Sequence, residues 1–116
     1  MVVLGLDIGG ANIKAATADG HSVSRAFPIW QNRDGLLREL RQLPNLSESH
    51  YDLVALTMTA ELADCFENKS EGVEFVVRTV AEAFPDSVLR VWMTSGEFAE
   101  PDDAIELPNL VSAANW

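Results

Sequence analysis

Hydrophobic residues open the chain in a nearly unbroken run. Val2 to Ile8 is rich in β-branched residues and holds one charged side chain, Asp7, which predicts a central strand buried on both faces. Asn12 to Ala18 is predicted as a second strand, because the Asp-Gly pair that follows it is typical of hairpin turns. Ser22 to Ile29 is predicted as a third strand. The opening segment therefore predicts an antiparallel meander.

Beyond the meander the hydrophobic period becomes helical. Asp34 is predicted to cap a first helix that Pro44 ends, and its apolar face holds Leu36, Leu37, Leu40 and Leu43. Asn68 is predicted to cap a second helix, with Glu71 at the third helical position completing a capping box. The apolar stripe of this second helix comprises Val73, Val76, Val77, Val80, Ala81 and Phe84.

Two further strands follow the predicted helices, Tyr51 to Thr57 and Ser87 to Met93. A strand that follows a helix in this way is normally parallel to its neighbour. The order βββαβαβ predicts an α/β fold with a mixed five-stranded sheet, the layout of a ribonuclease H-like domain. We interpret residues 1–116 as one such lobe. Residues 97–116 are a tail with an apolar end, and we expect it to lead into a second lobe of a longer protein.

Composition restricts the partners of the chain. The 116 residues carry a formal net charge of −10, which disfavours binding to nucleic acid and to acidic membrane surfaces. The apolar opening run is too short for a membrane span. Cys65 is the single cysteine, so no internal disulfide can form, and a reducing cytoplasmic setting fits best.

The segment LGLDIGGANIKAA, residues 4–16, carries the strongest candidate chemistry. Gly9 and Gly10 free the backbone amides of residues 9–12 to face one anion, Asn12 can donate a hydrogen bond and Lys14 can add a positive charge. Asp7 at the strand end can hold Mg²⁺ beside a bound phosphate. Each glycine alone fits an ordinary tight turn equally well, and Lys14 alone is most often a solvated residue. The combination favours a phosphate site.

Two other glycine motifs do not fit the spacing. A dinucleotide fingerprint beginning at Gly5 requires glycine where Asp7 stands. A P-loop beginning at Gly5 requires lysine and a hydroxyl residue where Ala11 and Asn12 stand.

The pattern Asp-Ile-Gly-Gly-Ala-Asn-Ile-Lys after a buried strand resembles the first phosphate loop of the actin, hexokinase and heat-shock-chaperone ATPase superfamily. Sugar kinases of that group often carry threonine at the position of Ala11. Together with TMTAELADCFENKSEGV and PNLVSAANW, the segment is similar to the hydantoinase/oxoprolinase relatives, and among them to the tetrahydromethanopterin-linked one-carbon transfer pathway proteins.

This resemblance implies a transferase activity. Such relatives act in methanofuran biosynthesis as furanmethanamine synthases, which join an aminomethylfuran diphosphate to the phenol of γ-glutamyltyramine. The resemblance implies Mg²⁺ as cofactor, ATP or a diphosphate as ligand, and residues 9–12 with Lys14 as the binding loop. It also implies a two-lobed protein with an adenosine-type pocket in the second lobe.

Three further residues are candidates with ordinary alternatives. Glu61 and Asp64 follow a predicted strand end and can supply a general base for a phenol, or they can form the acidic first turn of a helix. The resemblance favours Glu61 as a catalytic residue, together with Asp7 and Lys14, which would stabilise the charge on the leaving diphosphate. Lys69 can reach a phosphate, although a solvated lysine near a helix start is the commoner case.

Alternative functions remain open at this stage. One is an ATP-dependent kinase or a hydantoinase/oxoprolinase-type ATPase lobe, since the same fold hosts several reactions. Another is a non-catalytic interaction module, which docks onto a second lobe or a second copy through an open face. A metal-dependent nuclease ranks last, because it needs a cluster of carboxylates around Asp7 and the acidic charge opposes its substrate.

Overall fold

The structure is a computed structural model that describes residues 1–43 and 50–111. Its strands are β1 (Val3–Ile8), β2 (Asn12–Thr17), β3 (Ser22–Ala26), β4 (Leu53–Met58), β5 (Val88–Trp92) and β6 (Phe98–Ala99). Its α-helices are α1 (Leu36–Arg41), α2 (Lys69–Ala83) and α3 (Pro101–Glu106). Short 3₁₀ turns are η1 (Arg33–Gly35), η2 (Ala60–Leu62) and η3 (Pro108–Leu110).

The strands form a single mixed sheet in the order β3-β2-β1-β4-β5-β6. β1, β2 and β3 pair as an antiparallel meander, and β1, β4 and β5 run parallel. The predicted α/β class and the ribonuclease H-like order of strands are confirmed. The predicted number of five strands is wrong, because β6 turns back and pairs antiparallel with β5. The positive φ of 84° at Gly96 permits this tight reversal.

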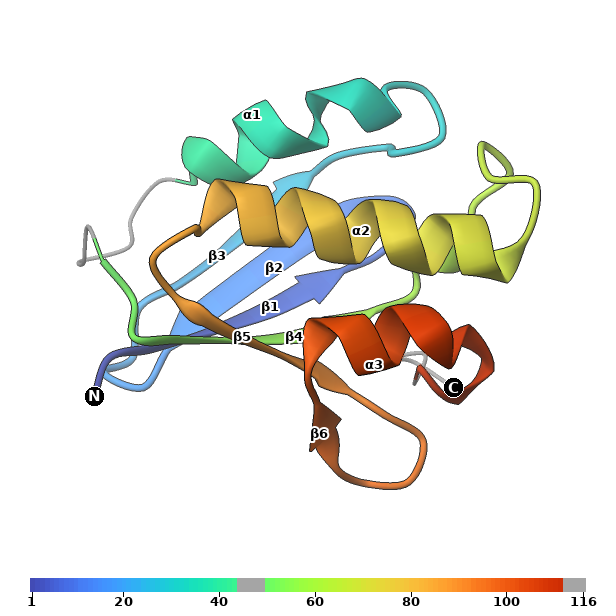
Figure 1. Cartoon of the computed structure of the whole chain (residues 1–116). Helices are drawn as coiled ribbons and strands as arrows, with labels where there is room; N and C mark the ends of the chain where they lie inside the picture. Colours follow the sequence, from blue (N-terminus) through green and yellow to red (C-terminus); the bar gives the residue numbers. More distant parts are fainter. Residues whose placement is uncertain (44–49, 112–116) are drawn as a thin grey trace.

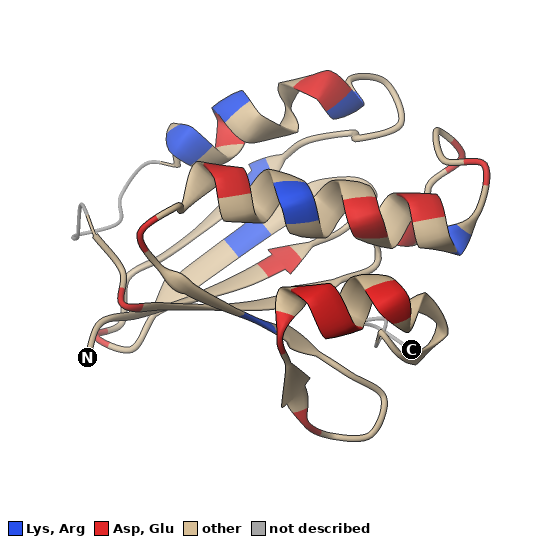
Figure 2. Ribbon diagram, in the orientation of Figure 1, with Lys and Arg blue, Asp and Glu red and all other residues tan. Residues whose placement is uncertain are grey.

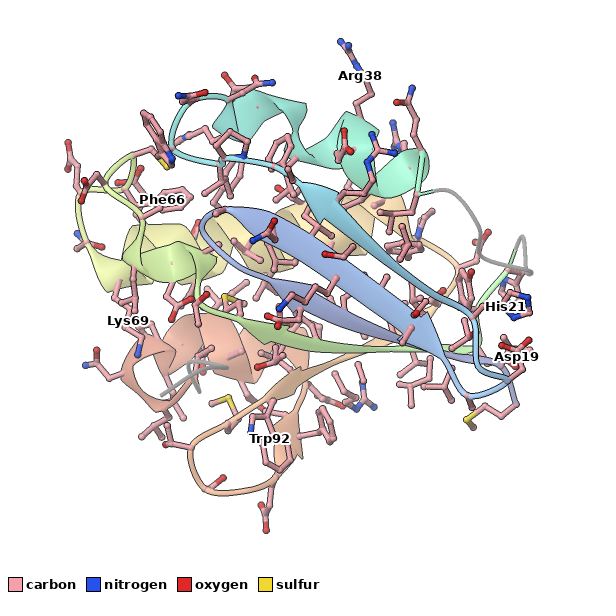
Figure 3. The ribbon with its side chains drawn as sticks, turned by 180° about the vertical axis from the view of Figure 1, so that it is seen from behind. Asp19, His21, Arg38, Phe66, Lys69 and Trp92 are labelled. Atoms are coloured by element: carbon pink, nitrogen blue, oxygen red, sulfur yellow. The ribbon has the colours of Figure 1, made fainter. Side chains whose placement is uncertain are left out.

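The two faces of the sheet differ. On one face, α1 and α2 cover the strands, and α3 lies beside α2 (Figure 1). Residues that alternate along β1 and β4 point into this layer and are fully buried, among them Leu4, Ile8, Val54 and Met58. The opposite face carries small and polar residues at the intervening positions of the strands. Seen from behind, the strands lie in front and the helices lie beyond them (Figure 3).

The meander differs from its prediction at its end. β3 ends at Ala26 although the prediction extended it to Ile29. Pro28 has no amide hydrogen to donate, so the regular pairing cannot continue through it. The amides of Phe27 and Ile29 still donate to residues of the β1–β2 turn. Both side chains are buried, at 7% and 0% exposure.

The helices partly match their predictions. Asp34 does not cap α1, because the chain enters the helix through η1, which starts one residue before Asp34. Asn68 caps α2 as predicted, and its side chain accepts a hydrogen bond of 2.9 Å from the amide of Glu71. The four valines of the predicted stripe are buried, whereas Ala81 is exposed. Pro44 lies outside the described residues.

The described part of the tail packs against the domain. The amide of Thr94 donates to the carbonyl of Leu110 at 2.7 Å, and Met93 forms an isolated antiparallel bridge with Val111. Residues 97–111 therefore form the edge of this domain, and residues 112–116 of the predicted apolar end lie outside the described part. That the tail leads into a second lobe stays a prediction. Within the described residues, no helix has the length and apolarity needed to cross a membrane.

Candidate functional site

The turn between β1 and β2 is held by backbone hydrogen bonds on one side. The amide of Gly9 donates to the carbonyl of Asn12 at 2.9 Å. The carbonyl of Gly10 accepts from Ile29 at 3.2 Å, and the carbonyl of Ala11 accepts from Phe27 at 2.8 Å. Residues 27–29 therefore fix the orientation of two peptide planes in the turn.

These bonds determine where the amides of the turn point. The peptides are trans, so the N–H that follows a carbonyl points in the opposite direction. The amides of Ala11 and Asn12 thus point away from residues 27–29. Within the described part of the chain, the amides of Gly10, Ala11 and Asn12 have no backbone acceptor. Of the four amides predicted to face an anion, the amide of Gly9 is engaged internally.

Space, not a positive φ, explains the two glycines. Neither Gly9 nor Gly10 has a positive φ, so the turn does not require the left-handed conformation that glycine permits. A Cβ atom at Gly9 would lie 3.3 Å from the Asn12 carbonyl oxygen and 3.4 Å from the Thr59 hydroxyl. A Cβ atom at Gly10 would meet no atom within 4 Å among the described residues. Gly9 allows close packing of the turn, and Gly10 leaves room for a ligand to approach the backbone.

Asp7 and Lys14 face each other across the meander. They are register partners in the β1–β2 pair, so both side chains lie on the same face of the sheet. Asp7 is half-buried and Lys14 is exposed. Neither makes an ion pair or a side-chain hydrogen bond with any described residue. Both charges are therefore available to a ligand.

A small pocket joins these groups. It has a volume of about 260 Å³ and is lined by Asp7, Gly9, Gly10, Ala11, Asn12, Lys14 and Thr59. We call it the turn pocket. The structure therefore brings together the residues of the predicted phosphate loop and the predicted metal ligand.

Two threonines at this site were not predicted. Thr57 is the register partner of Asp7 on β4, and its hydroxyl is buried without a hydrogen-bond partner among the described residues. Thr59 lines the turn pocket directly. The sequence TMT at the end of β4 is a weak signal, because only the parallel pairing of β4 with β1 places these hydroxyls beside Asp7.

The donor set of the turn pocket fits a phosphate better than a bare metal ion. Free amides, a lysine and a hydroxyl are groups that bind phosphate oxygens. Asp7 is the one carboxylate in the pocket, and no group of three or more His, Cys, Asp or Glu residues in the described chain could hold a metal. Mg²⁺ fits here only if phosphate or water oxygens complete its shell.

Glu61 lies apart from the turn pocket. It is 2% exposed, and neither carboxylate oxygen has a hydrogen-bond partner in the described residues. Burial raises the pKa of this carboxyl, while the charge of Lys69 partly opposes the rise. α2 packs directly over it, since a Cβ atom at Gly72 would lie 2.6 Å from the Cα of Glu61. Its role as a general base stays a prediction.

Asp64 and Lys69 also lie outside the turn pocket. The ammonium group of Lys69 donates to the carbonyl of Val111 at 3.3 Å and so contacts the tail (Figure 3). Asp64 is exposed and lines a second pocket that adjoins the turn. Their proposed roles toward phosphate and phenol stay predictions.

The distribution of charged residues favours an anion at the turn between β1 and β2. Among the helices α3 is acidic, because every charged residue in it is Asp or Glu, whereas α1 and α2 carry charges of both signs (Figure 2). Lys14 lies on the sheet, on the face that these helices do not cover. An anionic ligand is therefore disfavoured over α3 and favoured near the turn.

Comparison with known proteins gives one informative match. Over its full length the chain is 40% identical to the (4-{4-[2-(gamma-L-glutamylamino)ethyl]phenoxymethyl}furan-2-yl)methanamine synthase of Methanocaldococcus jannaschii. The aligned 119 positions span 34% of that protein, so the chain corresponds to about a third of its length. No protein-family model matches the chain.

Proposed function

We propose that this chain is the phosphate-binding part of a cytoplasmic alkyl-transferring synthase that acts with Mg²⁺ in methanofuran biosynthesis. The observation that carries the proposal is the turn pocket, with three amides free of backbone acceptors beside Lys14 and Asp7. The full-length similarity to a synthase of 40% identity supports the reaction class. Because the chain spans 34% of that relative, the whole reaction requires further protein.

The name of the relative's product indicates the bond to be made. The product is a phenoxymethyl-furan, in which a phenol oxygen is joined to the methylene carbon on a furan ring. In the proposed reaction the phenol oxygen forms the new C–O bond, and the bond from that carbon to a diphosphate breaks. The diphosphate leaves with the electron pair, and the phenol proton passes to a base. The proposed substrate is therefore an arylmethyl diphosphate.

Residues of the turn pocket would stabilise the departing diphosphate. The amides of residues 10–12 and the ammonium of Lys14 would donate hydrogen bonds to its oxygens as negative charge develops there. Asp7 would hold Mg²⁺ against the same oxygens, and the metal would supply further neutralisation of charge. Glu61 is buried away from this pocket, so we do not assign the base to it in its present position.

Calorimetric titration with pyrophosphate, with and without Mg²⁺, tests the proposal. We expect binding that Mg²⁺ strengthens, and Gly10→Val should weaken it at least about tenfold, ~1.4 kcal/mol, by filling the open approach to the amides. Asp7→Asn should remove the enhancement by Mg²⁺. Arg38→Gln is the control, because Arg38 is exposed on α1 and points into solvent (Figure 3). Equal affinity for wild type and Gly10→Val would contradict the proposal.

An ATP-binding lobe of the kinase or hydantoinase/oxoprolinase type is the alternative within the same pocket. Backbone amides and Lys14 bind phosphate oxygens whatever carries them, so the turn alone does not choose the ligand. Titration with ATP under the same conditions separates the two. Binding of ATP that is clearly tighter than that of pyrophosphate would favour the alternative.

A second candidate function is docking through the uncovered face of the sheet. A broad pocket of about 870 Å³ lies there, bounded by Trp92 and Phe98, whose ring centroids are 4.9 Å apart. Its floor is made of small residues, including Gly5, Ala16 and Ala55. We call this surface the open face. Small side chains at these positions allow an element of another lobe to pack closely.

We propose a second lobe as the occupant of the open face, because the relative is about three times as long as the chain. Size-exclusion chromatography of the chain mixed with the unmatched part of the relative is the test. We expect a one-to-one complex that Phe98→Asp abolishes and that Asp86→Asn, a change in an exposed turn, leaves intact. Homodimers of the chain alone that exclude the added lobe would overturn this candidate.

A further inference from the structure

A second pocket adjoins the turn pocket. It has a volume of about 490 Å³ and is lined by Gly10, Ala11, Trp30, Leu62, Ala63 and Asp64. Gly10 and Ala11 line both pockets, so a ligand bound at the turn can extend from one into the other. We call it the tryptophan pocket.

Two large apolar side chains of this pocket face solvent. Trp30 is 57% exposed and Leu62 is 63% exposed. Trp30 follows Ile29, which is fully buried and donates its amide to the carbonyl of Gly10 at 3.2 Å. Leu62 is held in η2, where its amide donates to the carbonyl of Thr59 at 3.1 Å. The backbone therefore fixes both residues beside the turn, where they offer an apolar surface to a flat ring.

A carboxylate lies on the same surface. Asp64 is exposed and makes no ion pair or side-chain hydrogen bond with any described residue. Together the two pockets therefore offer a cationic phosphate site, an apolar wall and an anionic group. These groups are complementary to a molecule that carries a diphosphate, an aromatic ring and an ammonium group.

From this geometry we infer that the tryptophan pocket binds the aromatic ring and the primary amine of an arylmethyl diphosphate whose diphosphate occupies the turn pocket. The inference rests on the proposed function and assigns the substrate's organic part to named residues. Trp30 and Leu62 contact the ring, and Asp64 pairs with the ammonium group. None of these residues takes part in bond making, so they determine binding and specificity.

The open face is the competing location for the ring. It also borders Asp7 and Lys14, and Trp92 and Phe98 supply aromatic surface there. These rings lie on β5 and β6, however, and β4 separates β5 from β1. At about 4.8 Å between adjacent strands, they are about 10 Å or more from β1 across the sheet. Trp30 follows a residue bonded to the turn, so the tryptophan pocket is the nearer of the two.

Binding of three probes tests the inference: pyrophosphate, benzyl diphosphate and 3-(aminomethyl)benzyl diphosphate. We expect benzyl diphosphate to bind the wild-type chain about tenfold more tightly than pyrophosphate, the ratio that ~1.4 kcal/mol provides. Trp30→Ala should remove this gain and leave pyrophosphate binding unchanged. The aminomethyl group should give a further gain that Asp64→Asn removes.

Matched controls separate the possible outcomes. Phe98→Ala removes another exposed aromatic ring, 51% exposed, and should change none of the three affinities. If Phe98→Ala loses the tighter binding of benzyl diphosphate and Trp30→Ala keeps it, the inference is wrong and the ring of the ligand lies on the open face. If pyrophosphate binds and benzyl diphosphate binds no more tightly, the inference is wrong but the proposed function is not affected. If no probe binds, the proposed function fails and the inference fails with it.

Discussion

At the scale of single residues, Gly72 shows how close α2 comes to the rest of the fold. A Cβ atom at this position would lie 2.6 Å from the Cα and 2.7 Å from the carbonyl oxygen of Glu61, which are both backbone atoms. Backbone cannot swing aside as a flexible side chain can, so a methyl group here has to displace α2 or η2. Glycine at this position therefore reflects packing.

We predict that Gly72→Ala lowers the free energy of unfolding. Overpacking costs about 1–3 kcal/mol, which exceeds the gain of about 1 kcal/mol that alanine brings to a helix interior. Gly10→Ala is the matched control, because no described atom lies within 4 Å of its Cβ position. Denaturant unfolding of both variants checks this, and equal stability of Gly72→Ala and wild type would contradict the described contact.

Glu61 gives a prediction about pH. Burial raises its pKa in the folded chain above the ordinary value of 4.5, so the folded state favours the protonated form. Its contribution to stability is present below that ordinary value and is lost as pH rises through the raised pKa. Glu61→Gln removes this titration. The variant should therefore gain stability relative to wild type as pH increases above about 4.5.

Melting temperatures of wild type and Glu61→Gln across this pH range provide the measurement. Glu82→Gln is the control, because it makes the same substitution on the exposed surface of α2. A constant difference between Glu61→Gln and wild type at every pH would mean that Glu61 is not shifted in the folded chain.

Individual site residues differ in how far the sequence reveals them. Asp7, Gly9, Gly10, Asn12 and Lys14 were predicted together because a single hairpin holds them close in sequence. Thr57 and Thr59 were missed, since they reach Asp7 and Gly9 only through the pairing of β4 with β1. Trp30 was missed for a similar reason. It lies beside the turn because the amide of its neighbour Ile29 donates a hydrogen bond to the carbonyl of Gly10.

At the scale of elements, α2 is the most completely predicted part. Its valine stripe has a clear helical period, and its start has a capping residue at the expected spacing. The capping box is altered in one respect. The carboxylate of Glu71 accepts from the amide of Glu67 at 3.2 Å and pairs with Arg33 at 2.9 Å. Glu71 therefore ties the loop before α2 to η1.

We predict that Asn68→Ala destabilises the chain by about 1 kcal/mol, the usual cost of losing an N-terminal cap. Asn68→Asp should retain nearly full stability, because its carboxylate can accept the same bond from the amide of Glu71. Thermal or denaturant unfolding of the two variants is the comparison. A loss of the same size in both would show that the cap contributes nothing.

The elements after β5 could not be predicted from periodicity. β6 has two residues and α3 has six, both too short for a hydrophobic period to emerge. Their positions depend on tertiary contacts, such as the bond of Thr94 to the carbonyl of Leu110. The class of the fold was predicted because it depends on long, regular segments. The edge of the sheet after β5 was not predicted, because it depends on these tertiary contacts.

At the scale of the whole molecule, the sheet is asymmetric. One face is covered by helices and forms the core (Figure 1). The open face and the turn carry the exposed rings of Phe98 and Trp30 and the charges of Asp7 and Lys14. The net charge of −10 opposes anions at long range, so a phosphate must be bound by local donors. The account therefore depends on the amides of the turn between β1 and β2.

Titration of a ¹⁵N-labelled chain with pyrophosphate and Mg²⁺, followed by proton–nitrogen correlation spectra, tests this claim most directly. The account predicts that the amide signals of Gly10, Ala11 and Asn12 shift most. The amide signal of Gly9 should shift less, because that amide already donates to the carbonyl of Asn12. If these three signals stay in place while pyrophosphate binds elsewhere, or if no signal moves at all, the turn is not a phosphate site.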